Sequence, residues 1–272
     1  MSSYHAILGL YLPVIQYFKD QSKQTMENIT HIHKQLRDAC DYWRLFSRPD
    51  YIDKRYDVLK IGEEHAKELI DAKKLHVDVY LSRDFISHTD VLDGVMHLDA
   101  DPHQEHSDYF VVQREGDVVG LARQIVYKGR GKHHESFPVL EKAHIHKRSI
   151  NRILNHHPTE IVEISALVKK SGESTVVPLL LYRALWFHSW DAKHRLWVMA
   201  CDVRLYQRLK MLFGPALTVI GRRTPYQGGD VIPVALDVTR GKNYMHKLAS
   251  AKRRDVLDIR RRAARFMAGL PD

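Results

Sequence analysis

The sequence predicts an α/β protein, in which a mixed sheet is flanked by helices. The 272 residues include 44% hydrophobic and 28% charged residues, the balance of a globular chain. Short apolar runs that suit strands alternate with longer stretches in which apolar residues recur every three or four positions, as in helices. The core segments follow the order β-α, β-β, β-α-β-α-β-β, which indicates a mixed sheet with helices on its faces.

The two ends of the chain are expected to be helical. Apolar residues recur at helical spacing over residues 11–46, and Ser47-Arg48-Pro49-Asp50 interrupts them, since proline disfavours helix in the residue before it. We therefore expect a helical N-terminal extension at 1–50, a core domain at 51–240, and a basic amphipathic helix at 241–272.

The core is expected to open with a strand at 55–61 and a helix that starts at Gly62. An irregular loop follows at 99–107, the turn at 115–117 favours a hairpin, and residues 128–158 form a polar insertion. The other expected strands are 109–113, 118–127, 160–168, 196–201, 216–220 and 232–238, and the other expected helices are 175–190 and 203–213.

A glycine-containing loop lies between the predicted central strand and a helix. A helix N-terminus offers unpaired N–H groups and partial positive charge, which suit a pyrophosphate or a phosphopantetheine phosphate. The same pattern also fits an ordinary helix start, capped by a hydroxyl side chain. The candidate residues for binding the phosphate of such a cosubstrate, which we call the donor loop, are Val168, Lys169, Lys170, Gly172, Ser174 and Thr175.

Two motifs resemble those of GNAT acetyltransferases. Lys169-x-x-Gly172-x-Ser174 is similar to the donor loop of that family, and it has the strand-loop-helix setting of that loop. The segment from Asp202 to Gly214 resembles the helix in which a tyrosine protonates the departing thiolate. The resemblance therefore implies an acid role for Tyr206.

A closer resemblance is to the acyl-homoserine lactone (autoinducer) synthases and the N-acyl amino acid synthases. These proteins have an aspartate-rich loop, then Gly-x-x-Arg, then Glu-x-Ser-Arg. Here the corresponding segments are Asp99-Ala-Asp101, Gly120-Leu-Ala-Arg123 and Glu163-Ile-Ser165-Ala166. His76-Val-Asp-Val-Tyr80 resembles the segment after the first helix of that family, with His76 in place of the usual arginine.

The resemblance implies an N-acyltransferase that moves an acyl group from an acyl carrier protein or CoA thioester to the amine of an amino acid or similar small acceptor. Glu163 would accept the amine proton, and Arg123 would orient the acceptor or support Glu163. An ion pair between these two that ties neighbouring strands together is the structural alternative. Ala166 argues against a lactone product. The implied substrate-binding residues are Asp99, Asp101 and Ser165.

Cysteine and histidine chemistry is not indicated. The two cysteines, Cys40 and Cys201, form no CxxC motif, and Cys201 is expected to be a buried small side chain. The eighteen histidines match no metal motif that we recognise. We therefore expect no metal and no permanently bound cofactor, with the acyl-ACP or acyl-CoA as co-substrate.

The formal net charge is +9, and arginines cluster near the C-terminus. A basic helix at 245–267 can pack on the core, dock an acidic acyl carrier protein or contact an anionic membrane surface; nucleic-acid binding is weaker, since no known motif accompanies the charge. A non-catalytic GNAT-like domain that binds nucleic acid or a protein partner through this helix is the alternative function. The N-terminal apolar stretch lacks the features of a signal peptide, so we expect a cytoplasmic location.

Overall fold

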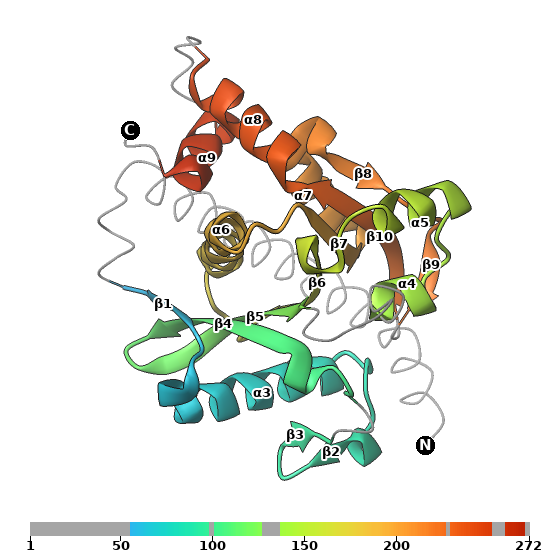
Figure 1. Cartoon of the computed structure of the whole chain (residues 1–272). Coiled ribbons are helices and arrows are strands. Elements are labelled where there is room, and N and C mark those ends of the chain that lie inside the picture. The colour runs from blue at the N-terminus through green and yellow to red at the C-terminus, as the bar shows by residue number, and fades with distance from the viewer. Residues whose placement is uncertain (1–54, 98–100, 127–136, 227–228, 252–258, 270–272) are drawn as a thin grey trace, which may run out of the picture. The chain divides into compact units, whose positions relative to one another are not determined.

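The computed structural model describes residues 55–97, 101–126, 137–226, 229–251 and 259–269 (Figure 1). The chain divides into two units, Met1–Trp43 and Arg44–Asp272, and all described residues belong to the second. The predicted N-terminal helices, Asp99 and Cys40 lie outside the described residues.

One eight-stranded mixed sheet forms the centre of the second unit. Its strand order is β1-β4-β5-β6-β7-β10-β8, and β9 pairs with β10. Neighbouring strands are antiparallel except for β6 and β7, which are parallel. The predicted α/β fold with a mixed sheet is confirmed. The strands are β1 (Asp57–Lys60), β4 (Ser107–Arg114), β5 (Asp117–Val126), β6 (Ile161–Lys169), β7 (Leu196–Cys201), β8 (Leu217–Val219), β9 (Thr224–Tyr226) and β10 (Gly229–Asp237).

Two long helices, α3 (Ala66–Leu81) and α6 (Val176–Asp191), cover opposite faces of the sheet (Figure 1). Successive residues of β5 show this, because side chains alternate between the faces of a strand. Leu121 packs in a buried cluster with Ala72 of α3. A Cβ atom at Gly120 would lie 2.3 Å from Val177 Cγ1 of α6, so glycine lets this helix approach the strand closely.

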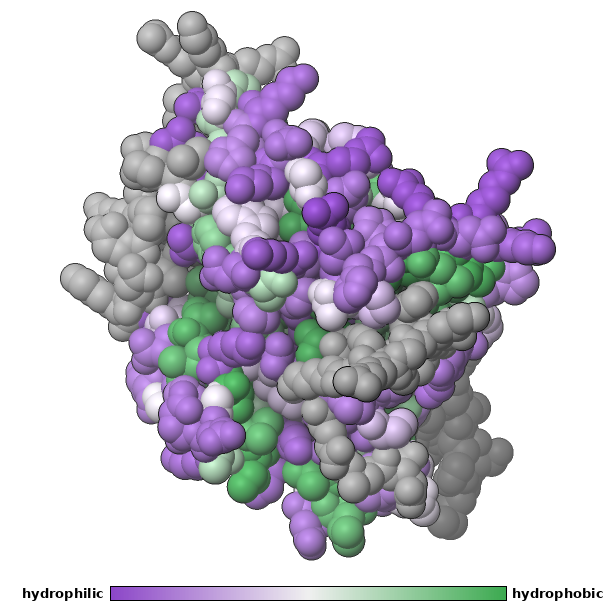
Figure 2. Space-filling model, viewed as in Figure 1, coloured by the Kyte–Doolittle hydropathy of each residue, from purple (hydrophilic) through white to green (hydrophobic). Residues whose placement is uncertain are grey.

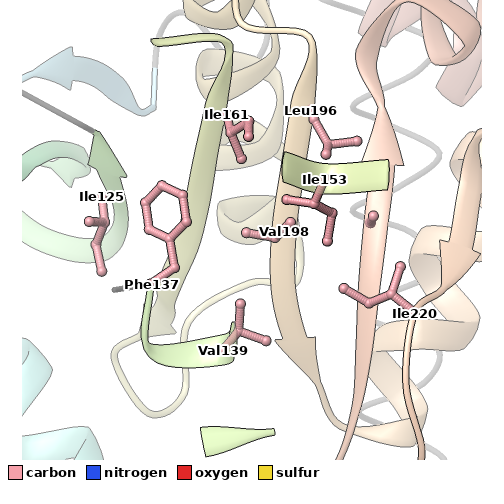
Figure 3. Packing of buried hydrophobic residues seen from close by; sticks show 9 residues of the cluster. Ile125, Phe137, Val139, Ile153, Ile161, Leu196, Val198 and Ile220 are labelled. Atoms are coloured by element: carbon pink, nitrogen blue, oxygen red, sulfur yellow. The ribbon is translucent and has the colours of Figure 1, made fainter. Parts of the chain in front are cut away.

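The insertion contributes to the core, although its polar sequence predicts only an insertion. It contains two short helices, α4 (Pro138–Lys142) and α5 (Lys147–Leu154). Val139 and Ile153 of these helices pack against Ile125 of β5 and Ile161 of β6 (Figure 3). Ile125 lies on the same face of β5 as Leu121, so α4 and α5 cover the α3 face further along the sheet.

The C-terminal region has two helices where the sequence predicts one. α8 (Val238–Ala249) follows β10 directly, and its N-cap Asp237 accepts a 2.8 Å hydrogen bond from the backbone N–H of Arg240. α9 (Ile259–Ala268) packs against α8, and the guanidinium of Arg183 lies 4.5 Å from the ring centre of Phe266. The predicted basic helix therefore includes residues that belong to the folded core.

Three further details differ from the sequence prediction. α3 runs on to Leu81, so His76 and Tyr80 lie inside this helix rather than after it. A small hairpin of β2 (Val91–Leu92) and β3 (Val95–Met96) follows α3, and β9 is an additional strand. α7 (Val203–Phe213) and β7 have the predicted bounds. Among the described helices, none combines the length and apolar character needed to cross a bilayer.

Candidate active site

A β-bulge brings the predicted site residues of β5 and β6 to one face of the sheet. Arg123 is paired with Ala166, but the next residue, Gln124, is paired with Ile164, so Ser165 is the extra residue. Without this extra residue, Glu163 and Ala166 would point to opposite faces. With it, Glu163 points to the same face as Ala166 and the strand partner of Ala166, Arg123. This is the face that α3 and α4 cover.

Arg123 connects this bulge with the predicted aspartate-rich loop. Its Nε donates a 2.6 Å hydrogen bond to Ser165 Oγ, and its Nη1 forms an ion pair with Asp101 Oδ2. Arg123 and Asp101 are 6% and 5% exposed, so this is a buried charge pair. Each partner compensates the charge of the other, which makes the loss of either one costly. The buried ion pair thus joins Arg123 to Asp101, and not to Glu163 as in the structural alternative.

Glu163 lies 3% exposed on β6, beside this pair. Its Oε2 accepts a 3.0 Å hydrogen bond from the backbone N–H of Val139 in α4. Burial raises the pKa of the Glu163 carboxyl to about 8, although the Val139 hydrogen bond and the charge of Arg123 act in the opposite direction. A carboxyl group with such a pKa can both accept and release a proton near neutral pH.

α3 closes the other side of the cluster. Tyr80 Oη donates a 3.4 Å hydrogen bond to the backbone carbonyl of Ser165, and its ring contacts that of His76 edge-on at a centroid distance of 4.1 Å. Tyr109 of β4 is buried, and it is the register partner of Arg123 on β5. The structure therefore brings together four predicted residues, Asp101, Arg123, Glu163 and Ser165, and adds aromatic side chains to them.

The parallel strands β6 and β7 pair only near the start of β6. Their register covers Ile161, Val162 and Glu163 of β6, although this strand continues to Lys169. Beyond Glu163, the β7-facing edge of β6 has no ladder partner among the described residues. An unpaired strand edge presents N–H and C=O groups that an amide-containing ligand can pair with. This edge begins next to the buried carboxyl group of Glu163.

The candidate donor loop lies at the far end of the same strand. Gly172 has φ +82°, a left-handed conformation that favours glycine. Lys169 Nζ donates a 2.7 Å hydrogen bond to the backbone carbonyl of Glu173, so this lysine braces the loop. Glu173, through its side chain, is also ion-paired with Arg114 at 2.9 Å.

The remaining candidates of this loop have different environments. Ser174 Oγ accepts a 3.2 Å hydrogen bond from the N–H of Val176, as expected for an ordinary helix start. Thr175 is buried, and its hydroxyl has no hydrogen-bond partner among the described residues. Val168 packs in the hydrophobic cluster under α3, and the N–H of Lys170 bonds the carbonyl of Val119. Donor binding by these residues remains a prediction.

Two other residues that the sequence analysis considered lie apart from this cluster. Tyr206 is a half-buried residue of α7, and within the described residues no hydrogen bond or ion pair joins its side chain to Glu163 or Arg123. Cys201 is fully buried at the end of β7, and burial raises the pKa of its thiol, which keeps it in the unreactive protonated form. In the part of the chain that the structure describes, no group of three or more His, Cys, Asp and Glu side chains is arranged to hold a metal ion.

Sequence reasoning missed the contributions of Val139 and Tyr109. Val139 acts through its backbone N–H, which carries no sequence signal, and it lies 24 residues from Glu163. Tyr109 stands in a strand whose apolar pattern gives it only a core role. Tyr80 belongs to the sequence motif that begins at His76, and the spacing of four residues places both side chains on one face of α3.

Comparison with known proteins supports the fold. No protein-family model and no curated protein sequence matches this chain, whereas solved structures do. The N-acyl amino acid synthase FeeM from uncultured soil microbes is 13% identical with a TM-score of 0.51, over 70% of this chain and 94% of FeeM. The CoA-dependent acyl-homoserine lactone synthase MesI is 17% identical with a TM-score of 0.51, over 80% of this chain and 97% of MesI.

A third structure is the CoA-dependent acyl-homoserine lactone synthase BjaI with MTA. It is 15% identical with a TM-score of 0.52, over 80% of this chain and 90% of BjaI. The chain therefore has the GNAT-like fold shared by these synthases, and the resemblance inferred from the motifs is confirmed for the fold. At these identities the likeness concerns the fold, while the activity follows from the site.

Proposed function

We propose that this chain is an N-acyltransferase that moves an acyl group from a CoA or acyl carrier protein thioester to the amine of an amino acid or similar small acceptor. The observation that carries the proposal is the buried Glu163, whose pKa of about 8 suits proton transfer with an amine. It lies beside a buried Arg123–Asp101 pair on a GNAT-like sheet. An apolar core alone gives no reason for three ionisable side chains at this place.

In the proposed reaction, the amine nitrogen attacks the thioester carbonyl, a C–N bond forms and the C–S bond breaks. Glu163 as carboxylate takes the proton that the amine loses, directly or through a water, and the departing thiolate takes up a proton from an acid. The Asp101–Arg123–Ser165 contacts keep β5, β6 and the loop before β4 in a fixed arrangement around Glu163. Pre-organised geometry of this kind lowers the barrier for attack.

The β7-facing edge of β6 beyond Glu163, which has no ladder partner among the described residues, is the proposed place for the thioester arm. The amide groups of the thioester arm can pair with this edge of β6. The strand leads to the loop of Gly172 and to the N-terminus of α6, where a phosphate of the donor can bind. Thr175, whose hydroxyl at this helix start has no hydrogen-bond partner within the described part of the chain, is the loop residue best suited to a donor phosphate. Tyr206 remains the proposed acid for the thiolate, by the resemblance alone.

The acceptor is proposed to bind on the α3 face, near Asp101 and Ser165. Ala166 faces the same side of β6 as Arg123, so this face lacks the second arginine of the Glu-x-Ser-Arg pattern. A small amine such as an amino acid therefore fits the site better than the substrate of a lactone-forming synthase. The expected product is an N-acylated amine.

The test is intact-mass analysis of lipid extracts from cells that express the full chain. A new acylated amine is expected with the wild type and not with Glu163→Gln, which keeps the shape of the side chain but cannot accept the proton. Circular dichroism of both purified proteins checks that the variant is folded. The proposal is wrong if the folded variant yields as much product as the wild type, or if the wild type yields none.

A further inference from the structure

The buried imidazole of His76 has an unused hydrogen-bonding atom. His76 is 3% exposed, and its Nε2 has no hydrogen-bond partner among the described residues. Buried polar atoms in folded proteins nearly always have a partner, and one that lacks it lowers stability. An apolar side chain would suit this position better if packing were its only role.

The position of His76 relates this atom to the candidate active site. Ala72, His76 and Tyr80 are spaced by four residues, so they lie on one face of α3. Ala72 packs in the cluster between α3 and the sheet, and Tyr80 reaches the backbone of Ser165. His76 therefore lies between these two contacts, on the side of α3 that faces Arg123.

The imidazole is neutral at this place. Burial, and then the positive charge of Arg123, lower the pKa of His76 to about 3. A neutral imidazole offers at Nε2 one N–H donor or one lone pair, according to its tautomer, and no charge. It can bind a hydroxyl, an amide or an amine, but it cannot form the bidentate ion pair that an arginine makes with a carboxylate.

The neighbouring Arg123 already has partners in the protein. Its guanidinium bonds Ser165 and Asp101. These contacts make Arg123 a positioning residue. Within the described residues, His76 Nε2 is a buried polar atom beside this group that has no hydrogen-bond partner.

We infer that His76 is an acceptor-binding residue, whose Nε2 forms a hydrogen bond with an uncharged polar group of the amine acceptor bound beside Arg123. The inference rests on the proposed function and makes its acceptor more specific. By the resemblance, the synthases usually have an arginine at this position, and here a neutral histidine takes its place. The acceptor is accordingly an amine that carries a hydroxyl, amide or second amine group toward α3.

The test compares His76→Leu and His76→Gln in the full chain. Glutamine keeps a side-chain amide that can replace the Nε2 hydrogen bond, whereas leucine fills the site without any polar atom. His246→Leu, in the half-buried face of α8, is the matched control for a histidine-to-leucine change within a helix. The acylated amine in lipid extracts is quantified at equal amounts of soluble protein, and urea unfolding is followed for each purified protein.

We expect His76→Leu to lower the acylated amine about tenfold, the effect of one lost hydrogen bond of about 1.4 kcal/mol. His76→Gln is expected to restore most of the product. The urea midpoint of His76→Leu should equal or exceed that of the wild type, because the variant no longer buries an unpaired nitrogen.

Two results would overturn the inference while the proposed function stands. One is an unchanged product yield in a folded His76→Leu protein. The other is a urea midpoint that falls further than in His246→Leu, which would assign His76 a structural role. If the wild type itself forms no acylated amine, the proposed function fails and this inference fails with it.

Discussion

At the scale of single residues, the site is built around one carboxyl group in an unfavourable environment. Glu163 is removed from water, and the backbone N–H of Val139 and the charge of Arg123 compensate its negative charge only in part, whereas Arg123 and Asp101 form an ion pair. Burial of the charged carboxylate is unfavourable. It raises the pKa of the group and does not unfold the chain, because the carboxyl group can take up a proton and become neutral. Once ionised, such a carboxylate takes up a proton readily, because its raised pKa favours the protonated form.

The raised pKa makes stability depend on pH in a defined direction. The carboxyl of Glu163 ordinarily titrates near 4.5, and in the folded chain near 8, so the folded state binds the proton more tightly. The stability that this proton contributes is complete below about pH 4.5 and is lost as the pH rises through 8. Glu163→Gln stays neutral, so its free energy of unfolding should exceed that of the wild type increasingly between these pH values, by on the order of 3–5 kcal/mol above pH 8.

Urea unfolding of both proteins at several pH values between 5 and about 9 measures this difference. Glu160→Gln is the matched control, since Glu160 forms a surface ion pair with Arg195 at 3.0 Å. Its effect should stay below about 1 kcal/mol throughout. A difference between Glu163→Gln and the wild type that does not change with pH would contradict the burial of this carboxyl group.

The residues of the site differ in how far the sequence can predict them. Arg123 and Glu163 stand in strongly patterned strands, and their order along the chain matches known motifs, so both were found. The motifs include His76 and Tyr80 but place them after the helix, whereas both lie within α3. The hydrogen bond of Val139 depends on where the insertion folds back, and a backbone donor leaves no trace in composition.

At the scale of elements, the apolar pattern of the sequence predicts that a strand exists better than it predicts the local geometry of that strand. The central strand β6 and its neighbours were predicted because buried strands have continuous apolar runs. The bulge at Ser165 was not, since no glycine or other special residue marks it. Sequence patterns do not predict α4 and α5, because both helices are short and lie in an insertion that is polar as a whole, where a few apolar residues such as Ile153 attach them to the sheet.

The close approach of α6 to β5 gives a prediction for Gly120. A methyl group at this position would lie 2.3 Å from Val177 Cγ1, on a stiff β-branched side chain that is fully buried. Gly120→Ala should therefore lower the free energy of unfolding by about 1–3 kcal/mol. In the double variant with Val177→Ala, part of the loss should be recovered, because the two side chains share one space.

Gly229→Ala serves as the control for this pair of variants. Its new methyl group would lie 4.0 Å from Phe85, an ordinary contact, so a change within about 0.5 kcal/mol is expected. Denaturant unfolding of the four proteins measures the effects. Equal midpoints for Gly120→Ala and the wild type would show that α6 does not pack as closely as the structure has it.

At the scale of the whole molecule, the described part has its own core. One buried cluster joins α3 to β4, β5 and β6, and another joins α4 and α5 to β6, β7 and β10. Hydrophilic side chains cover much of the face seen in Figure 2, as expected for a surface in water. The candidate site lies where the two clusters meet, so packing on either side of it contributes to its rigidity.

This organisation predicts that residues 44–272 fold without the segment before them. Arg44–Asp272 forms a unit by its own contacts, and both hydrophobic clusters belong to it. The unit contains Trp186, whose ring lies 5.5 Å from that of Trp190 and 5.8 Å from that of Trp197, so tryptophan fluorescence reports on its core.

We expect a single cooperative urea transition for the shortened chain. The full chain with Trp43→Phe has the same three fluorophores and is the matched reference. A shortened chain that is soluble but shows no cooperative transition would mean that the first unit is needed to complete the fold.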